Sequence, residues 1–231
     1  MNPLPNPNYN VSIVIPAKNE EATIGDIIAK CKQYGQEIIV MDGHSTDNTR
    51  EVALAAGATA VIPDNGKGKG AAMRESVNHV KGEIMVFIDA DGSHDADDIP
   101  KLIAPIVRGD ADHVSGSRLI GGSSELHGGF DEFLRLTGSA FITACINFRF
   151  GVKISESQNG FRAIRTDVIK QLDLKENITT IEQEMIIKTI KKGFRLAEVP
   201  SHEYKRIAGY SKIKVSSVWL RYGYCLLKNL L

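Results

Sequence analysis

Two aspartates, one residue apart, directly follow an apolar run at residues 84–88, and they are well suited to hold a metal ion. Alternate residues of an extended chain point to the same side, so Asp89 and Asp91 can both face one ligand. Ala90, between them, leaves the backbone open to close approach. Carboxylate oxygens favour Mg²⁺ or Mn²⁺, which commonly share their coordination with substrate phosphates. The pattern therefore predicts a metal-bound diphosphate at Asp89 and Asp91.

The elements that must position these aspartates alternate in type along the chain. Short β-branched runs predict strands at residues 11–15, 37–41, 58–62 and 84–88. Helical periodicity or good helix formers predict helices at residues 21–34, 47–56 and 70–80. This rhythm implies right-handed crossovers between parallel strands. We therefore predict an α/β fold, with a Rossmann-like, mostly parallel sheet and helices on both faces.

Polar motifs follow three of the predicted strands. Residues 16–21 come after the first, residues 42–47 after the second, and Asp89 and Asp91 after the fourth. In an open parallel sheet, ligands lie beyond the carboxyl ends of the strands. Ser45 or Asp47 can alternatively serve as a helix cap, whereas Asp42 directly follows an apolar strand and is harder to explain in that way. We expect the three motifs to meet at one edge of the sheet.

A glycine-rich stretch at residues 66–72 precedes the third predicted helix. It is neither a Walker loop, since no lysine is followed by Ser or Thr at the required spacing, nor a dinucleotide-binding fingerprint. Backbone amides at a helix start can nevertheless approach a phosphate, helped by Lys67 or Lys69. The alternative interpretation is a flexible turn.

Charge and cysteine content exclude several classes of function. Lys plus Arg and Asp plus Glu number 28 each, so no basic field predicts nucleic-acid binding. Cys31, Cys145 and Cys225 are widely separated, which argues against a disulfide framework or a zinc site and fits a reducing cytosol. Residues 1–10 resemble a flexible tail and not a signal peptide. No run of about 18 apolar residues predicts a transmembrane helix.

These motifs together resemble the family 2 glycosyltransferases of the GT-A fold, and among them the polyprenyl-phosphate hexose synthases, of the dolichyl-phosphate mannose and glucose synthase type. The matching elements are Pro-x-x-Asn-Glu at residues 16–20, Asp-x-x-Ser-x-Asp-x-Thr at 42–49, Lys-Gly-x-Gly at 67–70, Asp-Ala-Asp at 89–91 and Gly-Ser-Arg at 116–118. The resemblance implies a GT-A domain at residues 11–212, after the tail at 1–10 and before a C-terminal helix at 213–231.

The resemblance also implies roles for particular residues. Binding of the nucleotide sugar would fall to Pro16, Ala17, Asn19, Glu20, Asp42, Lys69, Gly70, Asp89, Ala90, Asp91, Arg206 and Lys212. Binding of the acceptor phosphate would fall to Arg118, Arg135 and Ser139. Arginine suits this task because its paired donors match phosphate oxygens. The catalytic residues would be Asp89, Asp91, Arg118 and Arg135, with Mg²⁺ or Mn²⁺ on the two aspartates.

The implied reaction is inverting transfer of a hexose from a UDP- or GDP-sugar to a polyprenyl phosphate, dolichyl or undecaprenyl. A phosphate monoester has a second pKa of about 6, so it is already nucleophilic at neutral pH and needs no dedicated base. One departure concerns Glu156, two residues before Gln158, where the family often has Asp. The longer side chain leaves the role of this carboxylate open.

The C-terminal segment has apolar residues at helical spacing: Val218, Trp219, Tyr222, Leu226 and Leu230. Such an amphipathic helix can lie on a membrane or pack on the domain or a second subunit. We expect a cytoplasmic protein, peripheral on the cytoplasmic face of a membrane, with the bilayer surface or a small membrane protein as partner. A homodimer is left open.

Three rival functions remain. The first is a family 2 enzyme with a soluble sugar or polysaccharide acceptor, which needs a carboxylate base such as Glu156 or Asp131. The second, a sugar-nucleotide pyrophosphorylase, ranks lower because no glycine-rich loop follows the first strand. The third is a catalytically silent nucleotide-binding subunit, against which the presence of Asp89, Asp91, Arg206 and Lys212 argues.

Overall fold

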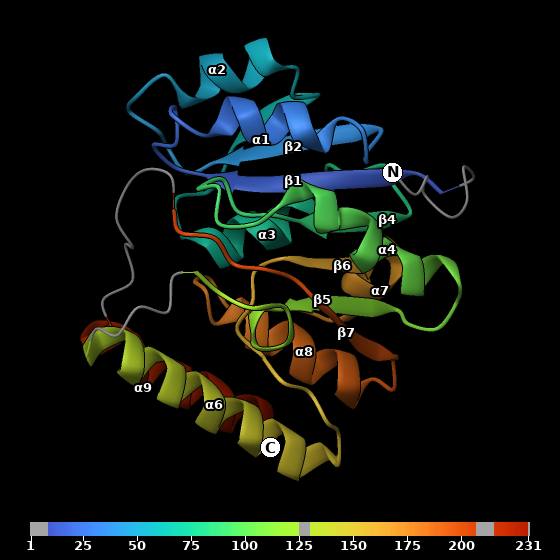
Figure 1. Cartoon of the computed structure of the whole chain (residues 1–231), viewed down its shortest axis with the longest axis vertical. Helices are drawn as coiled ribbons and strands as arrows, with labels where there is room; N and C mark the ends of the chain where they lie inside the picture. The colour runs from blue at the N-terminus through green and yellow to red at the C-terminus, as the bar shows by residue number, and fades with distance from the viewer. Residues whose placement is uncertain (1–8, 125–129, 207–214, 231) are drawn as a thin grey trace.

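One mixed sheet organises the part of the chain that the structure describes. The computed structural model describes residues 9–124, 130–206 and 215–230, and only the backbone of 130–135 and 215–218. The strands lie in the order β3-β2-β1-β4-β6-β5-β7 (Figure 1). They are β1 (Val11–Ala17), β2 (Glu37–Asp42), β3 (Ala60–Pro63), β4 (Ile84–Phe87), β5 (His113–Ser117), β6 (Arg162–Arg165) and β7 (Leu196–Pro200). The predicted division into tail, domain and C-terminal helix stays a prediction.

The first four strands run parallel to one another, as predicted. β1 pairs with β2 on one side and with β4 on the other, and β2 pairs with β3. The exception is β6, which runs antiparallel between β4 and β5. Since β4 directly neighbours β1, the polar residues that follow these two strands emerge together at the carboxyl edge. The predicted mostly parallel α/β architecture is thus confirmed, with one reversed strand that the sequence analysis did not identify.

Helices cover both faces of the sheet. They are α1 (Ile24–Cys31), α2 (Thr49–Ala56), α3 (Lys69–Ser76), η1 (Ala96–Asp98), α4 (Ile99–Val107), α5 (Arg118–Gly121), α6 (Phe130–Phe150), α7 (Thr166–Gln171), α8 (Ile181–Lys191) and α9 (Val215–Leu230). Ile13 and Ile15 of β1 face a core shared with α1, α2 and α4, whereas Val14 faces the core under α3, α7 and α8. This division follows from the alternation of side chains along a strand.

Helices α6 and α9 lie side by side and form a separate layer beside the sheet (Figure 1). Ile142 and Ile146 of α6 pack with Leu226 of α9 and with Ile186 and Ile187 of α8. Helices α6 and α9 therefore pack against the rest of the domain through α8. None of the helices in the described ranges is both long and apolar enough to cross a membrane.

Candidate active site

A cavity of about 810 Å³ lies at the carboxyl ends of β1 and β4. Part of its wall is ionic and includes Lys69, Asp89 and Asp91. Another part comes from α6 and α9 and includes Phe141 and Trp219. The cavity therefore lies at the edge of the sheet where the sequence motifs predicted a binding site.

Lys69 connects the first aspartate of the Asp-Ala-Asp motif to a carboxylate far away in sequence. Its Nζ lies 2.6 Å from Asp89 Oδ1 and 3.0 Å from Glu182 Oε1. Burial disfavours the charged lysine, but the two carboxylates outweigh this and raise the pKa of Lys69 above its ordinary value. Burial likewise opposes ionisation of Asp89, and Lys69 nevertheless lowers the pKa of that carboxyl. Glu182 was not identified from sequence, where it resembles an ordinary acidic residue in a first helical turn.

Asp91 has its own cationic partner. Its Oδ2 lies 3.0 Å from Nη1 of Arg206. Its Oδ1 accepts hydrogen bonds from the backbone N–H of Ser93 at 3.0 Å and from the Ser93 hydroxyl at 2.6 Å. One oxygen thus fixes the carboxylate on its own loop, while the other holds an arginine at the cavity wall. Asp91 and Arg206, both expected at the donor site, thus lie in contact with each other, and their binding roles stay predictions.

Carboxylate oxygens at Asp89 and Asp91 form a donor set suited to Mg²⁺ or Mn²⁺. Within the described residues, no group of three or more His, Cys, Asp or Glu side chains could hold a metal ion. Both aspartates also already pair with a cation. The residues therefore fit a metal that takes further ligands from phosphate and water, and not a closed protein cage.

His94 lies beside the first aspartate but is held by packing. Its ring stacks on Phe161 with the centroids 5.1 Å apart, and its Nε2 is 3.9 Å from Asp89 Oδ2. Burial lowers the pKa of His94, so the ring is neutral near pH 7. The sequence did not suggest a role for this residue, and the geometry makes it part of the cavity wall.

The loops after β1 and β2 support each other. The side-chain oxygen of Asn19 accepts a hydrogen bond from the backbone N–H of Thr46 at 2.8 Å. Asp42 is fully buried, 2.5 Å from Nε of Arg50. Burial opposes its ionisation, but hydrogen bonds from Ser45 and Arg50 lower the pKa of Asp42. Of the expected donor-binding residues in these loops, only Pro16, Ala17 and Glu20 line the cavity. Asn19, which is exposed, and Asp42, which is buried, stabilise these loops and do not line the cavity.

The glycine-rich stretch packs closely against a neighbouring loop. Gly68 caps the start of α3 with φ 113°, a conformation that favours glycine. A Cβ on Gly70 would lie 2.5 Å from the carbonyl oxygen of Ile178. Gly68 and Lys69 line the cavity, whereas Gly70 does not. The glycine at position 70 is thus explained by backbone packing against residues 176–178.

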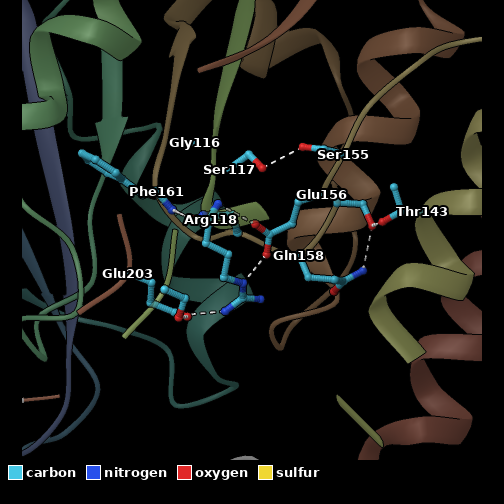
Figure 2. Close-up of polar contacts among 12 residues, drawn as sticks. Gly116, Ser117, Arg118, Thr143, Ser155, Glu156, Gln158, Phe161 and Glu203 are labelled. Atoms are coloured by element: carbon cyan, nitrogen blue, oxygen red, sulfur yellow. Dashed lines mark hydrogen bonds and ion pairs between the residues drawn. The ribbon is translucent and has the colours of Figure 1, made fainter. Parts of the chain in front are cut away.

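Arg118, which also lines the cavity, is held between two carboxylates (Figure 2). Its Nε lies 2.6 Å from Glu156 Oε1, and its Nη1 lies 2.6 Å from Glu203 Oε1. Burial disfavours its charge, but Glu156 and Glu203 prevail and raise the pKa of Arg118. Ser139 on α6 lines the same cavity. The side chains of Arg135 and Asp131, and all of Lys212, lie outside the described residues.

Glu156, which we considered as a base for a soluble acceptor, has no access to the cavity. It is 1% exposed, and its Oε2 accepts a hydrogen bond from the Arg118 backbone N–H at 3.0 Å. Burial raises the pKa of this carboxyl. Its position explains why a carboxylate is needed two residues before Gln158, since it anchors Arg118 from behind (Figure 2).

The wall contributed by α6 and α9 is largely apolar. It includes Phe141 and Ile142 from α6, and Trp219, Tyr222 and Leu226 from α9. Phe141 is 65% exposed and Trp219 is 61% exposed, so the apolar wall continues onto the outer surface. The cavity therefore joins charged groups at the strand ends to an apolar surface on two helices.

Comparison with known sequences identifies relatives of this chain. The sequence model described as "Glycosyl transferase family 2" matches residues 12–173. Glycosyltransferase AglJ of Haloferax volcanii is 33% identical over 208 residues, covering 89% of this chain and 66% of the relative. The dolichyl-phosphate hexose transferase of the same organism is 27% identical over 207 residues, covering 88% and 86%. The chain thus spans slightly less than two thirds of the length of AglJ.

Comparison with solved structures gives the same fold. A crystal structure of glucosyl-3-phosphoglycerate synthase from Mycobacterium tuberculosis, in complex with Mn²⁺, UDP and glucosyl-3-phosphoglycerate, superposes with a TM-score of 0.78. The identity is 23%, and the alignment covers 96% of this chain and 80% of that one. The predicted GT-A architecture is confirmed by this likeness.

Proposed function

Because the chain belongs to glycosyl transferase family 2, we propose that it is a glycosyltransferase that transfers a hexose from a nucleotide sugar to a polyprenyl phosphate. The observation that carries this proposal is the cavity that joins Lys69, Asp89 and Asp91 to the apolar wall of α6 and α9. An acceptor with an anionic head and an apolar chain matches both parts. The relative called dolichyl-phosphate hexose transferase supports the same acceptor class.

On the donor side, the proposal assigns the diphosphate to Asp89 and Asp91 through Mg²⁺ or Mn²⁺. Bound there, the metal would neutralise charge on the departing diphosphate. Arg206, 3.0 Å from Asp91, is placed to add a second positive charge. Lys212 is assigned to the same task from the sequence motif. Pro16, Ala17 and Glu20 form part of the wall at the end of β1, where the rest of the nucleotide is proposed to lie.

On the acceptor side, Arg118, Arg135 and Ser139 are proposed to hold the lipid phosphate. A phosphate oxygen attacks the anomeric carbon, a carbon–oxygen bond forms, and the bond to the diphosphate breaks with inversion. The monoester dianion carries no proton that must be removed. Orientation of the phosphate by the fixed guanidinium group of Arg118 then supplies much of the rate. This chemistry is consistent with the burial of Glu156, which leaves no base at that position.

We also propose that α6 and α9 rest on the cytoplasmic face of a membrane. Asp131 and Glu132, at the start of α6, are the acidic residues of these two helices, and residues 136–150 and 215–230 contain no Asp or Glu, although the whole chain has 28 such residues. Arg149, Arg221 and Lys228 supply positive charge on these helices. Exposed Phe148 and Leu220 supply apolar surface. Helices with basic and aromatic residues and few acidic ones suit an anionic lipid surface. The bilayer would then deliver the acceptor to the apolar wall.

A soluble sugar hydroxyl is the second candidate acceptor, because a carboxylate of α8 reaches the cavity. Glu182 lines it, 3.0 Å from Lys69. A hydroxyl acceptor needs a base within hydrogen-bond reach, and Glu182 is placed to provide one. In that case Glu182→Gln abolishes transfer while the donor still binds. With a lipid phosphate acceptor, the same variant keeps part of its activity.

The experiment that tests the proposal is transfer of radiolabelled sugar from a panel of UDP- and GDP-sugars to farnesyl phosphate, with and without Mg²⁺ or Mn²⁺. Metal-dependent label in the butanol phase, lost in Asp91→Ala, supports the lipid acceptor and identifies the donor. Metal-dependent donor hydrolysis without any lipid product contradicts it. A Lys101→Met variant, altered at an exposed lysine that pairs with Asp98, serves as the control.

A further inference from the structure

The segment at residues 201–206 connects the two halves of the cavity. At its start, the backbone N–H of Ser201 donates to the carbonyl oxygen of Ser117 at 3.1 Å, directly before Arg118. Further on, the N–H of Tyr204 donates to the carbonyl oxygen of Ser93 at 2.8 Å, two residues after Asp91. The segment is thus hydrogen-bonded both to the loop that carries Arg118, on the proposed acceptor side, and to the loop that carries Asp91, on the proposed donor side.

Glu203 lies in the middle of this segment with its position fixed. Its backbone N–H donates to the carbonyl oxygen of Gly122 at 3.0 Å, and its own carbonyl oxygen accepts from the N–H of Ser124 at 2.7 Å. Its Oε2 accepts from the Ser123 hydroxyl at 2.9 Å, and Oε1 pairs with Arg118 Nη1 at 2.6 Å. The residue is only 8% exposed. One carboxylate oxygen is thereby anchored, and the other faces the guanidinium.

This arrangement sets the direction of Arg118 before any ligand arrives (Figure 2). Glu156 forms an ion pair at Nε and Glu203 accepts a hydrogen bond from Nη1, so carboxylates contact the guanidinium at two of its nitrogens. A long, flexible arginine that is ordered in advance loses less entropy when it binds an anion. Three residues beyond Glu203, Arg206 pairs with Asp91. One short segment therefore holds the cation of the acceptor side and the anion of the donor side.

We propose that Glu203 is a positioning residue that orients Arg118 toward the acceptor phosphate and ties that arginine to the donor site through residues 201–206. The inference rests on the proposed function, in which Arg118 binds the acceptor. It adds a residue that sequence motifs did not indicate. Glu203 contributes no proton and contacts no reacting atom in this role.

The test measures steady-state kinetics of Glu203→Gln with farnesyl phosphate and the donor varied separately. We expect the KM for farnesyl phosphate to rise about tenfold, as for loss of a charged hydrogen bond, while the KM for the donor changes less than twofold. In an Arg118→Ala background, the same substitution should change the farnesyl phosphate KM less than twofold, because a residue that acts through Arg118 has nothing left to position.

Asp112→Asn is the matched control, since Asp112 is a buried carboxylate paired with Arg195 at the opposite end of β5. It should lower stability without altering either KM. An unchanged farnesyl phosphate KM in an active Glu203→Gln enzyme overturns the inference and leaves the proposed function intact. Equal, additive effects in the wild-type and Arg118→Ala backgrounds overturn it as well. Wild-type enzyme that makes no lipid product rejects the proposed function and this inference with it.

Discussion

Lys69 Nζ lies 2.6 Å from Asp89 Oδ1, so the first aspartate of the Asp-Ala-Asp motif is already neutralised by a lysine of the glycine-rich stretch. The same ammonium lies 3.0 Å from Glu182 Oε1. The glycine-rich stretch and the Asp-Ala-Asp motif thus form one electrostatic unit, in which a single lysine offsets part of the charge of two carboxylates. The proposed binding of a diphosphate depends on this compensation, because uncompensated carboxylates repel anions.

Removal of this lysine should therefore weaken donor binding. We expect Lys69→Met to raise the Kd for UDP or GDP about tenfold, as for loss of a charged hydrogen bond, with the fold retained. Isothermal titration calorimetry with the nucleotide and Mg²⁺ measures this Kd. Lys101→Met, which removes an exposed lysine 2.5 Å from Asp98, is the control and should bind as the wild type does. An unchanged Kd in Lys69→Met contradicts the electrostatic unit.

Metal binding should depend on the nucleotide. Asp89 is paired with Lys69 and Asp91 with Arg206, and the described residues offer no cluster of three side-chain ligands. A divalent ion alone must displace a cation and then rely on water, whereas a diphosphate supplies further oxygen ligands. Titration with Mn²⁺, followed by electron paramagnetic resonance, should show at least tenfold tighter binding with UDP or GDP present. Equal affinity with and without nucleotide would refute this account.

The sequence predicted the strands and the carboxyl-edge site well, for a physical reason. β-branched runs bounded by polar motifs mark a buried parallel strand, and β1, β2 and β4 begin at the residues expected, 11, 37 and 84. The predicted nucleotide and acceptor roles stay predictions, although Lys69, Asp91, Arg118 and Arg206 all line one cavity.

What the sequence did not predict depends on long-range pairing. Lys69 and Glu182 are 113 residues apart, and Arg118 and Glu203 are 85 apart, so no local pattern joins them. The antiparallel direction of β6 has the same origin, because it is set by its neighbours β4 and β5 and not by its own four residues. Asn19 and Asp42 belong to the recognised motifs but stabilise the loops without lining the cavity, a distinction that only the packing reveals.

The Asp112 carboxylate gives a pH dependence of stability with a defined sign. Hydrogen bonds from Arg195 lower the pKa of Asp112 in the folded protein. A depressed pKa contributes stability above the unfolded value of about 3.9, and that contribution is lost as the pH falls through the folded value. Because Arg195 is half exposed, solvent screens this ion pair, and we expect it to contribute about 1 kcal/mol to the free energy of unfolding. Urea unfolding should show Asp112→Asn less stable than wild type at pH 6, with the difference shrinking toward pH 3.

Docking of α9 on lipid can be tested by adding negative charge to its outer face. Leu220 and Leu227 are 66% and 64% exposed, so the double variant Leu220→Glu/Leu227→Glu should leave the fold intact. We expect its binding to vesicles that contain phosphatidylglycerol to fall at least tenfold, since each buried leucine contributes roughly 1.5–3 kcal/mol. Leu54→Glu on α2, at a leucine 56% exposed, is the control. Equal vesicle binding by all three proteins argues against a membrane-facing α9.

The most direct measurement of the central claim is ³¹P nuclear magnetic resonance of the acceptor during turnover with the preferred donor. Attack by the lipid phosphate converts a phosphate monoester into a diester, so we predict that the farnesyl phosphate monoester signal declines as a diester signal grows. The sugar in that product should carry the anomeric configuration opposite to that of the donor. A monoester signal that stays constant while the donor is consumed contradicts the account, because the sugar has then gone to a hydroxyl group or to water.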